Sequence, residues 1–400
     1  MPCSPAKARH LLKAERAVVK SCHPFTIQLT MATGQSKQPI KLGVDPGYEH
    51  AGFSASTEKE EVFACTVKMR TDITKLLAQR RALRHARRNR KMRYRAPRFN
   101  NRVRSKHKGW LAPSVENRIA VHLSFVAKIK RLLPITEVIV ESASFDLQKL
   151  QNPAISGAEY QEGPSLGQYN RRAAVLARDG YKCCCCHGKS KDPRLEVHHI
   201  ESRRTGGNAF NNLVTLCSTC HAGITNGNIK PKFKRGPSFQ AAAHMNIMRT
   251  KLLERLNEAN PELKIGITYG YITKFERDTR GIAKSHCADA FCIAGNFAAK
   301  RLGSYIFYLQ TRCHNRKIHK FKILEEGKRK LNQQKYELYG FRLFDKVSYL
   351  GQVGFIFGRR KSGYFDVRKL DGTLISDSVK YKNLRLLQKR TTYLSEIRKE

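Results

Sequence analysis

The stretch YKCCCCHGKSKDPRLEVHHIESRRTGGNAFNNLVTLCSTCHAGIT, residues 181–225, is the most informative part of the chain. Cys183 and Cys186 form one C-x2-C pair, and Cys217 and Cys220 form a second pair after thirty intervening residues. Two close pairs at this separation are typical of four thiolates around one tetrahedral zinc ion. We therefore predict a structural Zn²⁺ site that stabilises a small unit with little core of its own. The four consecutive cysteines allow other pairings, and only the C-x2-C rule selects the outer two.

Histidines lie between and after these pairs. The segment 196–200 alternates apolar and polar residues and is predicted to be a strand that presents His198 and His199. Asn212 would brace the following turn, and a helix would bring His221 back to the first strand. This is a ββα-metal arrangement, and the stretch closely resembles the HNH nucleases.

The resemblance implies a role for each of these residues. His199 would be the general base that activates water, because a neutral imidazole accepts a proton near pH 7. His198 and His221 would hold one Mg²⁺ beside the scissile phosphate, and Asn212 would position the loop. The alternative is a plain zinc knuckle without catalysis, which the two adjacent histidines, Asn212 and His221 disfavour.

The composition indicates a nucleic-acid partner. Lys and Arg number 76 against 32 Asp and Glu, which gives a net charge of +44 over 400 residues. Such a chain repels itself unless a polyanion neutralises it. An anionic membrane is the rival partner, but we find no apolar run long enough to span a bilayer and no signal peptide. We expect two to four domains, cysteines used as metal ligands and buried thiols, and a cytoplasmic, prokaryotic, nucleoid-associated protein.

The first 70 residues predict a small unit followed by a sheet. Ser4 can cap a helix that starts at Pro5, and a strand is expected at 25–29. Three strands are expected in 40–69, and the first ends at Asp45 before a glycine turn. An RNase H-like sheet opens in this way.

Residues 71–108 are rich in arginine. A helix with a short apolar stripe is expected to start near residue 71, and no acidic residue occurs between Ile73 and Val115. A helix without ion-pair partners is a natural ligand for phosphate backbone. The usual alternative is a solvated or disordered basic segment. We assign RNA binding to seven arginines: Arg80, Arg81, Arg84, Arg87, Arg88, Arg90 and Arg93.

Further acidic residues complete a second predicted site. An amphipathic helix at 118–132 precedes an apolar strand that ends at Glu141, and a later helix at 285–299 carries His286 and Asp289 on one face. If the strands that end at Asp45 and Glu141 are parallel neighbours, these carboxylates meet at one edge of the sheet. We predict a two-metal Mg²⁺ site formed by Asp45, Glu141 and Asp289, with His286 activating water.

Residues 336–400 are rich in Tyr, Phe and Gly and predict short strands separated by glycine turns, as in a small basic SH3-like barrel. The whole chain resembles the IscB family, the transposon-encoded RNA-guided nucleases ancestral to the type II CRISPR effectors. The motifs that carry the resemblance are LGVDPG, VIVES, SHCADA, EVHHI, LCSTCH and the arginine run QRRALRHARRNRKMRYR.

The resemblance implies a multidomain α/β protein. A split RuvC domain with an RNase H-like mixed sheet would carry an arginine-rich bridge helix, an inserted HNH domain with a zinc knuckle, and a C-terminal SH3-like barrel. The implied domains are PLMP-like 1–38, RuvC-I 39–70, bridge helix 71–108, RuvC-II 109–150, HNH 165–228, RuvC-III 229–312, a duplex-interaction linker 313–335 and a target-adjacent-motif-interacting domain 336–400.

The resemblance also implies partners and an activity. A guide-carrying ωRNA would bind the protein as a monomeric ribonucleoprotein, and base pairing would select double-stranded DNA next to a short target-adjacent motif. HNH would cut the guide-paired strand and RuvC the displaced strand, both by Mg²⁺-dependent hydrolysis. Two alternatives remain: a protein-only HNH endonuclease or transposase accessory, and a transposon-associated RNA-binding protein without guided cleavage.

Overall fold

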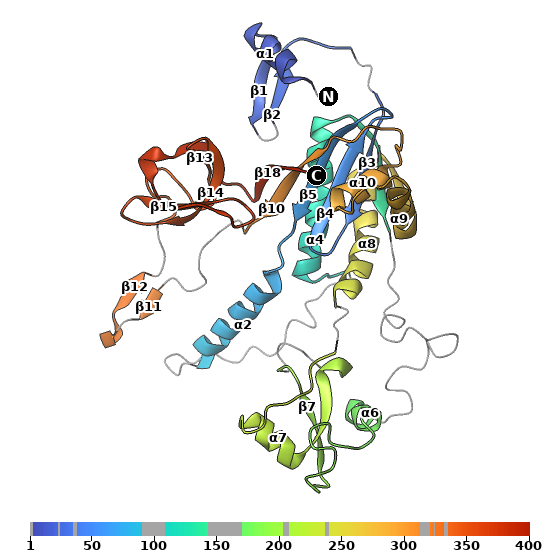
Figure 1. Ribbon diagram of the computed structural model, residues 1–400, viewed down its shortest axis with the longest axis vertical. Helices are drawn as coiled ribbons and strands as arrows, with labels where there is room; N and C mark the ends of the chain where they lie inside the picture. Colours follow the sequence, from blue (N-terminus) through green and yellow to red (C-terminus); the bar gives the residue numbers. More distant parts are fainter. Residues whose placement is uncertain are drawn as a thin grey trace. The chain divides into compact units, whose positions relative to one another are not determined.

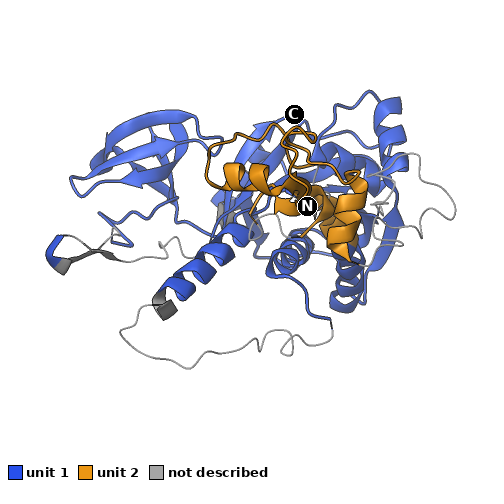
Figure 2. Cartoon of the chain, turned by 90° about the horizontal axis from the view of Figure 1, so that it is seen from below, with its two compact units in different colours: residues 1–143, 247–400 blue, residues 144–246 orange. Residues whose placement is uncertain are grey.

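The computed structural model describes residues 3–22, 25–34, 38–89, 109–142, 170–202, 208–236, 240–312, 321–323, 325–331 and 335–400. The chain divides into two compact units, coloured separately in Figure 2. Residues 1–143 and 247–400 form the first unit, and residues 144–246 form the second. Each unit is described by itself.

A seven-stranded mixed sheet organises the first unit, with strand order β18-β10-β5-β4-β3-β6-β9 (Figure 1). Strands β3, β4 and β5 form an antiparallel meander, and β6 and β9 continue the sheet in parallel with β3. The mixed sheet predicted from the sequence is therefore confirmed. The strand bounds are β3 Ile40–Pro46, β4 His50–Ser56, β5 Glu61–Lys68, β6 Ile135–Glu141, β9 Lys264–Thr268, β10 Ser304–Gln310 and β18 Tyr393–Lys399.

The sheet packs helices against its central strands. The rings of Phe53 on β4 and Phe125 on α4 stack with centroids 5.5 Å apart, so large apolar side chains fill the space between α4 and the sheet. On the strands β3 and β4, glycines replace such side chains where α10 passes. A Cβ at Gly43 would lie 2.6 Å from the backbone nitrogen of Ala294, and a Cβ at Gly52 would overlap the carbonyl group of His286. The backbone of α10 therefore lies directly on the sheet.

The helices of this unit differ in places from the sequence prediction. Helix α4 starts at Pro113, earlier than the predicted residue 118, because proline is well suited to the first turn. Helix α10 ends at Ala294, before the predicted residue 299, because Gly295 adopts a left-handed conformation with φ of 72°. The bounds are α4 Pro113–Leu132, α8 Gln240–Ala259, α9 Gly270–Thr279 and α10 His286–Ala294.

Helix α1 (Pro5–Lys13) starts as the sequence predicts. The Ser4 hydroxyl accepts a hydrogen bond from the backbone nitrogen of Lys7, and Pro5 occupies the first turn. The structure adds a strand that we did not predict, β1 (Ala17–Cys22), which pairs with the predicted strand β2 (Phe25–Leu29).

The C-terminal segment is divided between two sheets. Strands β13 to β17 form a five-stranded antiparallel sheet in the order β16-β15-β14-β13-β17. Strand β18 instead pairs antiparallel with β10 in the large sheet, so the predicted single domain 336–400 is wrong for its last strand. The bounds are β13 Lys346–Tyr349, β14 Gln352–Arg359, β15 Tyr364–Arg368, β16 Leu374–Lys380 and β17 Arg385–Gln388. A separate hairpin is formed by β11 Phe321–Ile323 and β12 Arg329–Leu331.

The arginine-rich helix is α2 (Ile73–Asn89). Arg80, Arg81 and Arg84 are exposed on it. Arg87 and Arg88 lie within its backbone bounds, and Arg90 and Arg93 lie outside the described residues. No helix in the described part of the chain is long and apolar enough to cross a bilayer.

The second unit contains the predicted ββα motif, preceded by a helix that we did not predict. Strands β7 and β8 pair antiparallel, with His198 opposite Val214, and α7 follows β8 directly. The bounds are α6 Arg171–Arg178, β7 Leu195–His199, the short helix η2 Phe210–Asn212, β8 Leu213–Cys217 and α7 Ser218–Thr225.

The tight contact between α10 and the sheet gives a first prediction. Gly43→Ala forces a methyl group against helix backbone that cannot move aside, so we expect the first unit to lose about 1–3 kcal/mol or more of stability. Thermal and denaturant unfolding of the full chain measure this loss. Gly34→Ala is the matched control, because no atom lies within 4 Å of a Cβ there. Equal stability of the two variants would contradict the packing described here.

Candidate active sites and zinc centre

Two carboxylates meet where strands β3 and β6 end. Val44 lies opposite Val140 in the parallel pairing, and Asp45 and Glu141 are the next residues on the two strands. These strands are therefore parallel neighbours, which is the condition for the two carboxylates to meet at one edge of the sheet. Asp45 is only 8% exposed. Burial raises the pKa of Glu141, and the negative charge of Asp45 raises it further. The edge of the sheet thus holds acidic groups that gain from a nearby cation.

Helix α10 brings a histidine to this edge. The Ser285 hydroxyl caps the helix by accepting a hydrogen bond from the Ala288 nitrogen. His286, the first helical residue, then places its Nδ1 atom 2.6 Å from Oδ2 of Asp45. This hydrogen bond raises the pKa of His286. Because a carboxylate oxygen accepts, Nδ1 donates the proton, and the ring is oriented through its Nδ1 side. The His50 ring stacks on it at 5.3 Å between centroids.

Two arginines lie beside the remaining carboxylates. Arg277 on α9 donates from Nη1 to Oδ1 of Asp289 at 2.7 Å. Arg249 on α8 places Nη2 3.7 Å from Oε1 of Glu141. Burial lowers the pKa of Arg249, while the charges of Glu141 and Asp45 oppose that change. Each carboxylate at this edge therefore has a cationic group nearby.

The hard oxygen donors of Asp45, Glu141 and Asp289 are the kind that Mg²⁺ prefers. In the described residues, however, their ligand atoms are not gathered into one compact set. Asp45 is hydrogen-bonded to His286, and Asp289 is hydrogen-bonded to Arg277. The oxygen donors fit Mg²⁺. To share one ion, the carboxylates of Asp45 and Asp289 would have to turn away from His286 and Arg277.

In the second unit, a carboxylate orients one of the predicted metal ligands. Nδ1 of His221 on α7 lies 2.6 Å from Oε2 of Glu196 on β7, and the hydrogen bond lowers the pKa of Glu196. The His198 ring packs edge-on against His221, with centroids 5.0 Å apart. Burial lowers the pKa of His198, which favours the neutral imidazole that binds metal. The two rings thus fit a shared divalent cation.

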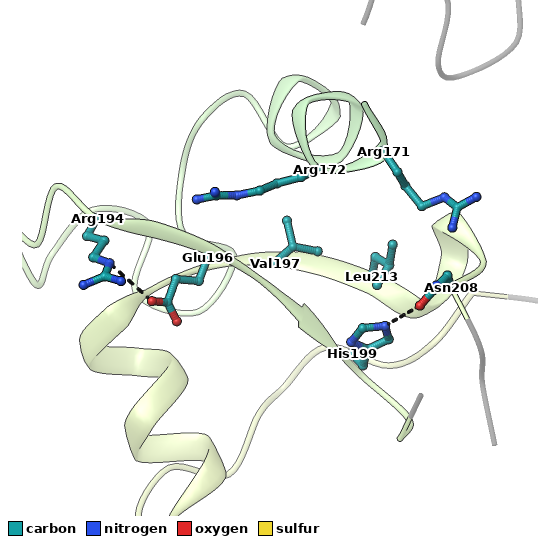
Figure 3. Close-up of a pocket in the computed structure, with 8 residues that line it drawn as sticks. All are labelled: Arg171, Arg172, Arg194, Glu196, Val197, His199, Asn208 and Leu213. Carbon is teal, nitrogen blue, oxygen red and sulfur yellow. Dashed lines mark hydrogen bonds and ion pairs between the residues drawn. The ribbon is translucent and has the colours of Figure 1, made fainter. Parts of the chain in front are cut away.

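His199 lies in an open depression of the same unit, shown in Figure 3. Its Nε2 atom is 2.9 Å from the Oδ1 atom of Asn208. Because an amide oxygen accepts, Nε2 donates and the Nδ1 lone pair can take a proton. The depression has a basic rim formed by Arg171 and Arg172 on α6 together with Arg194. A phosphate group would be attracted to this surface.

Asn212 is fully buried and holds the loop after β7. Its Oδ1 atom accepts from the backbone nitrogen of Glu201 at 2.8 Å, and its Nδ2 atom donates to the carbonyl oxygen of Glu201 at 3.0 Å. These two bonds close the loop from both sides. The loop that follows His199 is therefore anchored to the start of β8.

The four predicted zinc ligands come together. Cys183, Cys186, Cys217 and Cys220 have Sγ atoms that all lie within 4.8 Å of one another, and they form the only such group of metal-ligand side chains in the described ranges. Sγ of Cys186 and Sγ of Cys217 are 3.8 Å apart, close to the edge of about 3.8 Å expected for tetrahedral Zn–S bonds. Hydrogen bonding from Ser190 lowers the pKa of Cys186, which favours a thiolate. These residues fit Zn²⁺.

Two family models match the chain. The RRXRR protein model matches residues 1–163, and the HNH endonuclease model matches residues 183–227. The first match covers the arginine-rich helix and the first part of the large sheet, and the second covers the ββα unit and its cysteines. The two matches give the chain an RRXRR segment and an HNH endonuclease domain, in the order expected for IscB/Cas9-like proteins. The resemblance found in the sequence is confirmed.

Comparison with solved structures gives weaker similarities. One is Streptococcus thermophilus Cas9 in complex with AGGA PAM, at 15% identity and a TM-score of 0.35, over 55% of this chain and 31% of that chain. Another is T. thermophilus RuvC in complex with Holliday junction substrate, at 10% identity and a TM-score of 0.27, over 65% and 92%. The chain spans about a third of the Cas9 length. No curated protein matches the chain in sequence.

Several residues of these centres were missed by the sequence prediction. Arg277, Arg249 and Glu196 contact the predicted site residues Asp289, Glu141 and His221. Glu196 alone had a local signal, since it lies two residues before His198 and so on the same face of a strand. Nothing in the local sequence distinguishes the two arginines from the many others.

The zinc centre gives a second prediction. Cys220→Ser should remove roughly one zinc per chain and unfold the ββα unit, because structural zinc binding supplies folding free energy of order 10 kcal/mol. The matched control changes Cys184 and Cys185 to Ser and should keep the metal. Metal analysis of the two purified variants makes the comparison. Zinc lost from the control and kept in Cys220→Ser would reverse the assignment of ligands.

The contact between Glu196 and His221 gives a third prediction. Glu196→Ala should weaken divalent-metal binding at the His198–His221 pair by roughly 10- to 100-fold, because the imidazole loses the group that orients it. Titration with Mn²⁺, in an Asp45→Ala background that disables the other centre, measures the affinity.

Two variants act as controls for this experiment. Glu196→Gln keeps an oxygen acceptor for His221 and should lose less affinity. Arg194→Ala removes only a 3.4 Å contact to Glu196 and should change little. Unchanged Mn²⁺ affinity in Glu196→Ala, with zinc still bound, would mean that Glu196 does not position the ligand.

Proposed function

We propose that the chain is an RNA-guided DNA endonuclease with two separate hydrolytic centres. The observation that carries this proposal is the combination of carboxylates and His286 at the edge of a mixed sheet with a ββα unit that presents His198, His199 and His221. Each centre contains hard or borderline metal ligands and a histidine that can move a proton. Phosphodiester hydrolysis is the chemistry that needs both.

The carboxylate centre would cut the displaced DNA strand. Asp45, Glu141 and Asp289 would hold Mg²⁺, which supplies charge stabilisation at the phosphate when bound. His286, oriented by Asp45, would take the proton of the attacking water. Arg249 and Arg277 would keep the carboxylates in place before the metal binds, since buried like charges repel one another.

The ββα centre would cut the strand paired to the guide. His199 would act as general base through Nδ1, while Asn208 holds the opposite side of the ring. His198 and His221 would hold one Mg²⁺, and Asn212 would keep the intervening loop in register. Arg171, Arg172 and Arg194 would receive the phosphate backbone.

The partners follow from charge and the arginine helix. An ωRNA with its guide would contact α2 through Arg80, Arg81 and Arg84, and from the sequence we assign the same role to Arg87, Arg88, Arg90 and Arg93. Base pairing would then select the DNA, and the protein would grip the heteroduplex by shape and charge. The five-stranded sheet, as an SH3-like barrel, would read the target-adjacent motif. We place this monomeric ribonucleoprotein in a prokaryotic cytoplasm, bound to nucleic acid.

Separate centres give the fourth prediction. His199→Ala should nick only the displaced strand, and Asp45→Ala should nick only the guide-paired strand, each lost cut slowing by about 100-fold or more. The measurement uses the protein reconstituted with its co-purifying RNA and a duplex labelled differently on each strand. Loss of both cuts after either single change would show that the centres are not independent.

The same assay tests the guide. Protein treated with RNase, and protein loaded with an RNA whose guide does not match, should leave the duplex intact. Undiminished cleavage in both cases would exclude RNA guidance and favour a protein-only HNH endonuclease.

A further inference from the structure

Helix α9 and the residue before it, Tyr269, expose three aromatic side chains in the first unit. Tyr269 is 53% exposed, Tyr271 is 72% exposed and Phe275 is 66% exposed. The rings of Tyr269 and Tyr271 are nearly parallel, at 10° and 6.0 Å between centroids. Large aromatic groups normally gain free energy by burial, so an exposed group of three indicates a binding surface.

The fold of the helix does not need these side chains. Thr273 is buried, and Arg277, one turn later, reaches Asp289 on α10, so this face of α9 packs inward. Tyr271 and Phe275 are also four residues apart and therefore share a different face. Exposed Lys274 lies between them in sequence. The outward face thus combines flat apolar rings with Lys274 and with Asp278, whose carboxylate is paired with Arg277.

This surface starts next to the carboxylate centre. Gly270, between the two tyrosines, lies so close to Glu141 that an added Cβ would be 3.2 Å from Oε1. A strand whose phosphate reaches the carboxylates would therefore have its neighbouring bases near α9. Bases stack on aromatic rings irrespective of sequence, whereas paired bases in a duplex hide their faces.

We propose that Tyr269, Tyr271 and Phe275 form a stacking platform that binds unpaired bases of single-stranded DNA beside the carboxylate centre. The proposal deepens the proposed function, since it assumes that this centre receives the displaced strand. Single-stranded DNA is the favoured occupant because the chain carries a net charge of +44 and the adjoining centre has the chemistry of phosphodiester hydrolysis. A peptide would satisfy the rings but not these two features.

Photocrosslinking tests the platform directly. Full-length protein would be mixed with a short oligothymidylate that carries one 5-iodouracil, irradiated and digested with trypsin. We expect the crosslink on the peptide of residues 265–274, which contains both tyrosines, or on the following peptide with Phe275. Crosslinks confined to other peptides would overturn the proposal.

Binding measurements give an independent test. Tyr271→Ala together with Phe275→Ala should weaken oligothymidylate binding at least roughly fivefold at raised salt, where attraction to phosphate is reduced. Tyr271→Phe keeps the ring and should bind as the original protein does. Phe25→Ala is the matched control, because Phe25 is 58% exposed on β2. Equal affinity of the double variant and the control would also overturn the proposal.

The outcome can be separated from that of the proposed function. Asp45→Ala should abolish cutting of the displaced strand and leave the crosslink unchanged. If the original protein gave a crosslink on α9 but cut no DNA, the platform would be supported and the nuclease proposal refuted. The platform alone would be refuted if the original protein gave no crosslink on α9 and the double variant still performed guided cutting at the original rate.

Discussion

The approach of helix α10 to strands β3 and β4 is the constraint on which the carboxylate centre depends. Gly43 and Gly52 leave room for helix backbone where any side chain would collide with it. Only at that depth can His286, at the start of the helix, reach Asp45 at the end of its strand. The two glycines thus set the position of His286 by admitting the backbone of α10. The geometry of the centre therefore follows from backbone packing.

The two centres orient their histidines in the same way, although their surroundings are unrelated. In each, one nitrogen of a histidine ring is bonded to an oxygen acceptor, as in the pairs His286–Asp45, His221–Glu196 and His199–Asn208. The acceptor fixes the ring orientation and the position of its proton, so the other nitrogen is left for a metal or a proton. In one centre the histidine lies at the edge of the large sheet. In the other centre the histidines lie in the ββα unit that carries the four cysteines.

The sequence allowed prediction wherever the signal was local. The C-x2-C spacing identified the four cysteines. Two apolar strands that end in Asp45 and Glu141 indicated a shared edge on the condition that they pair in parallel, as β3 and β6 do. Contacts made only in three dimensions were missed. Arg277 meets Asp289 because α9 and α10 pack together, and it looks like any other arginine in a chain of net charge +44. Strand β18 was assigned to the wrong sheet because its partner β10 is remote in sequence.

The pairing of β10 with β18 has a consequence for the small sheet between them. Gln310 lies opposite Tyr393, and the Thr311 nitrogen donates to the Thr392 carbonyl oxygen at 2.7 Å. The chain therefore leaves the large sheet and returns to it at the same place. A segment attached in this way can change in size, or be exchanged for another fold, without altering the strands that carry Asp45 and Glu141. The residues that the small sheet presents are thus free to vary while Asp45 and Glu141 keep their positions.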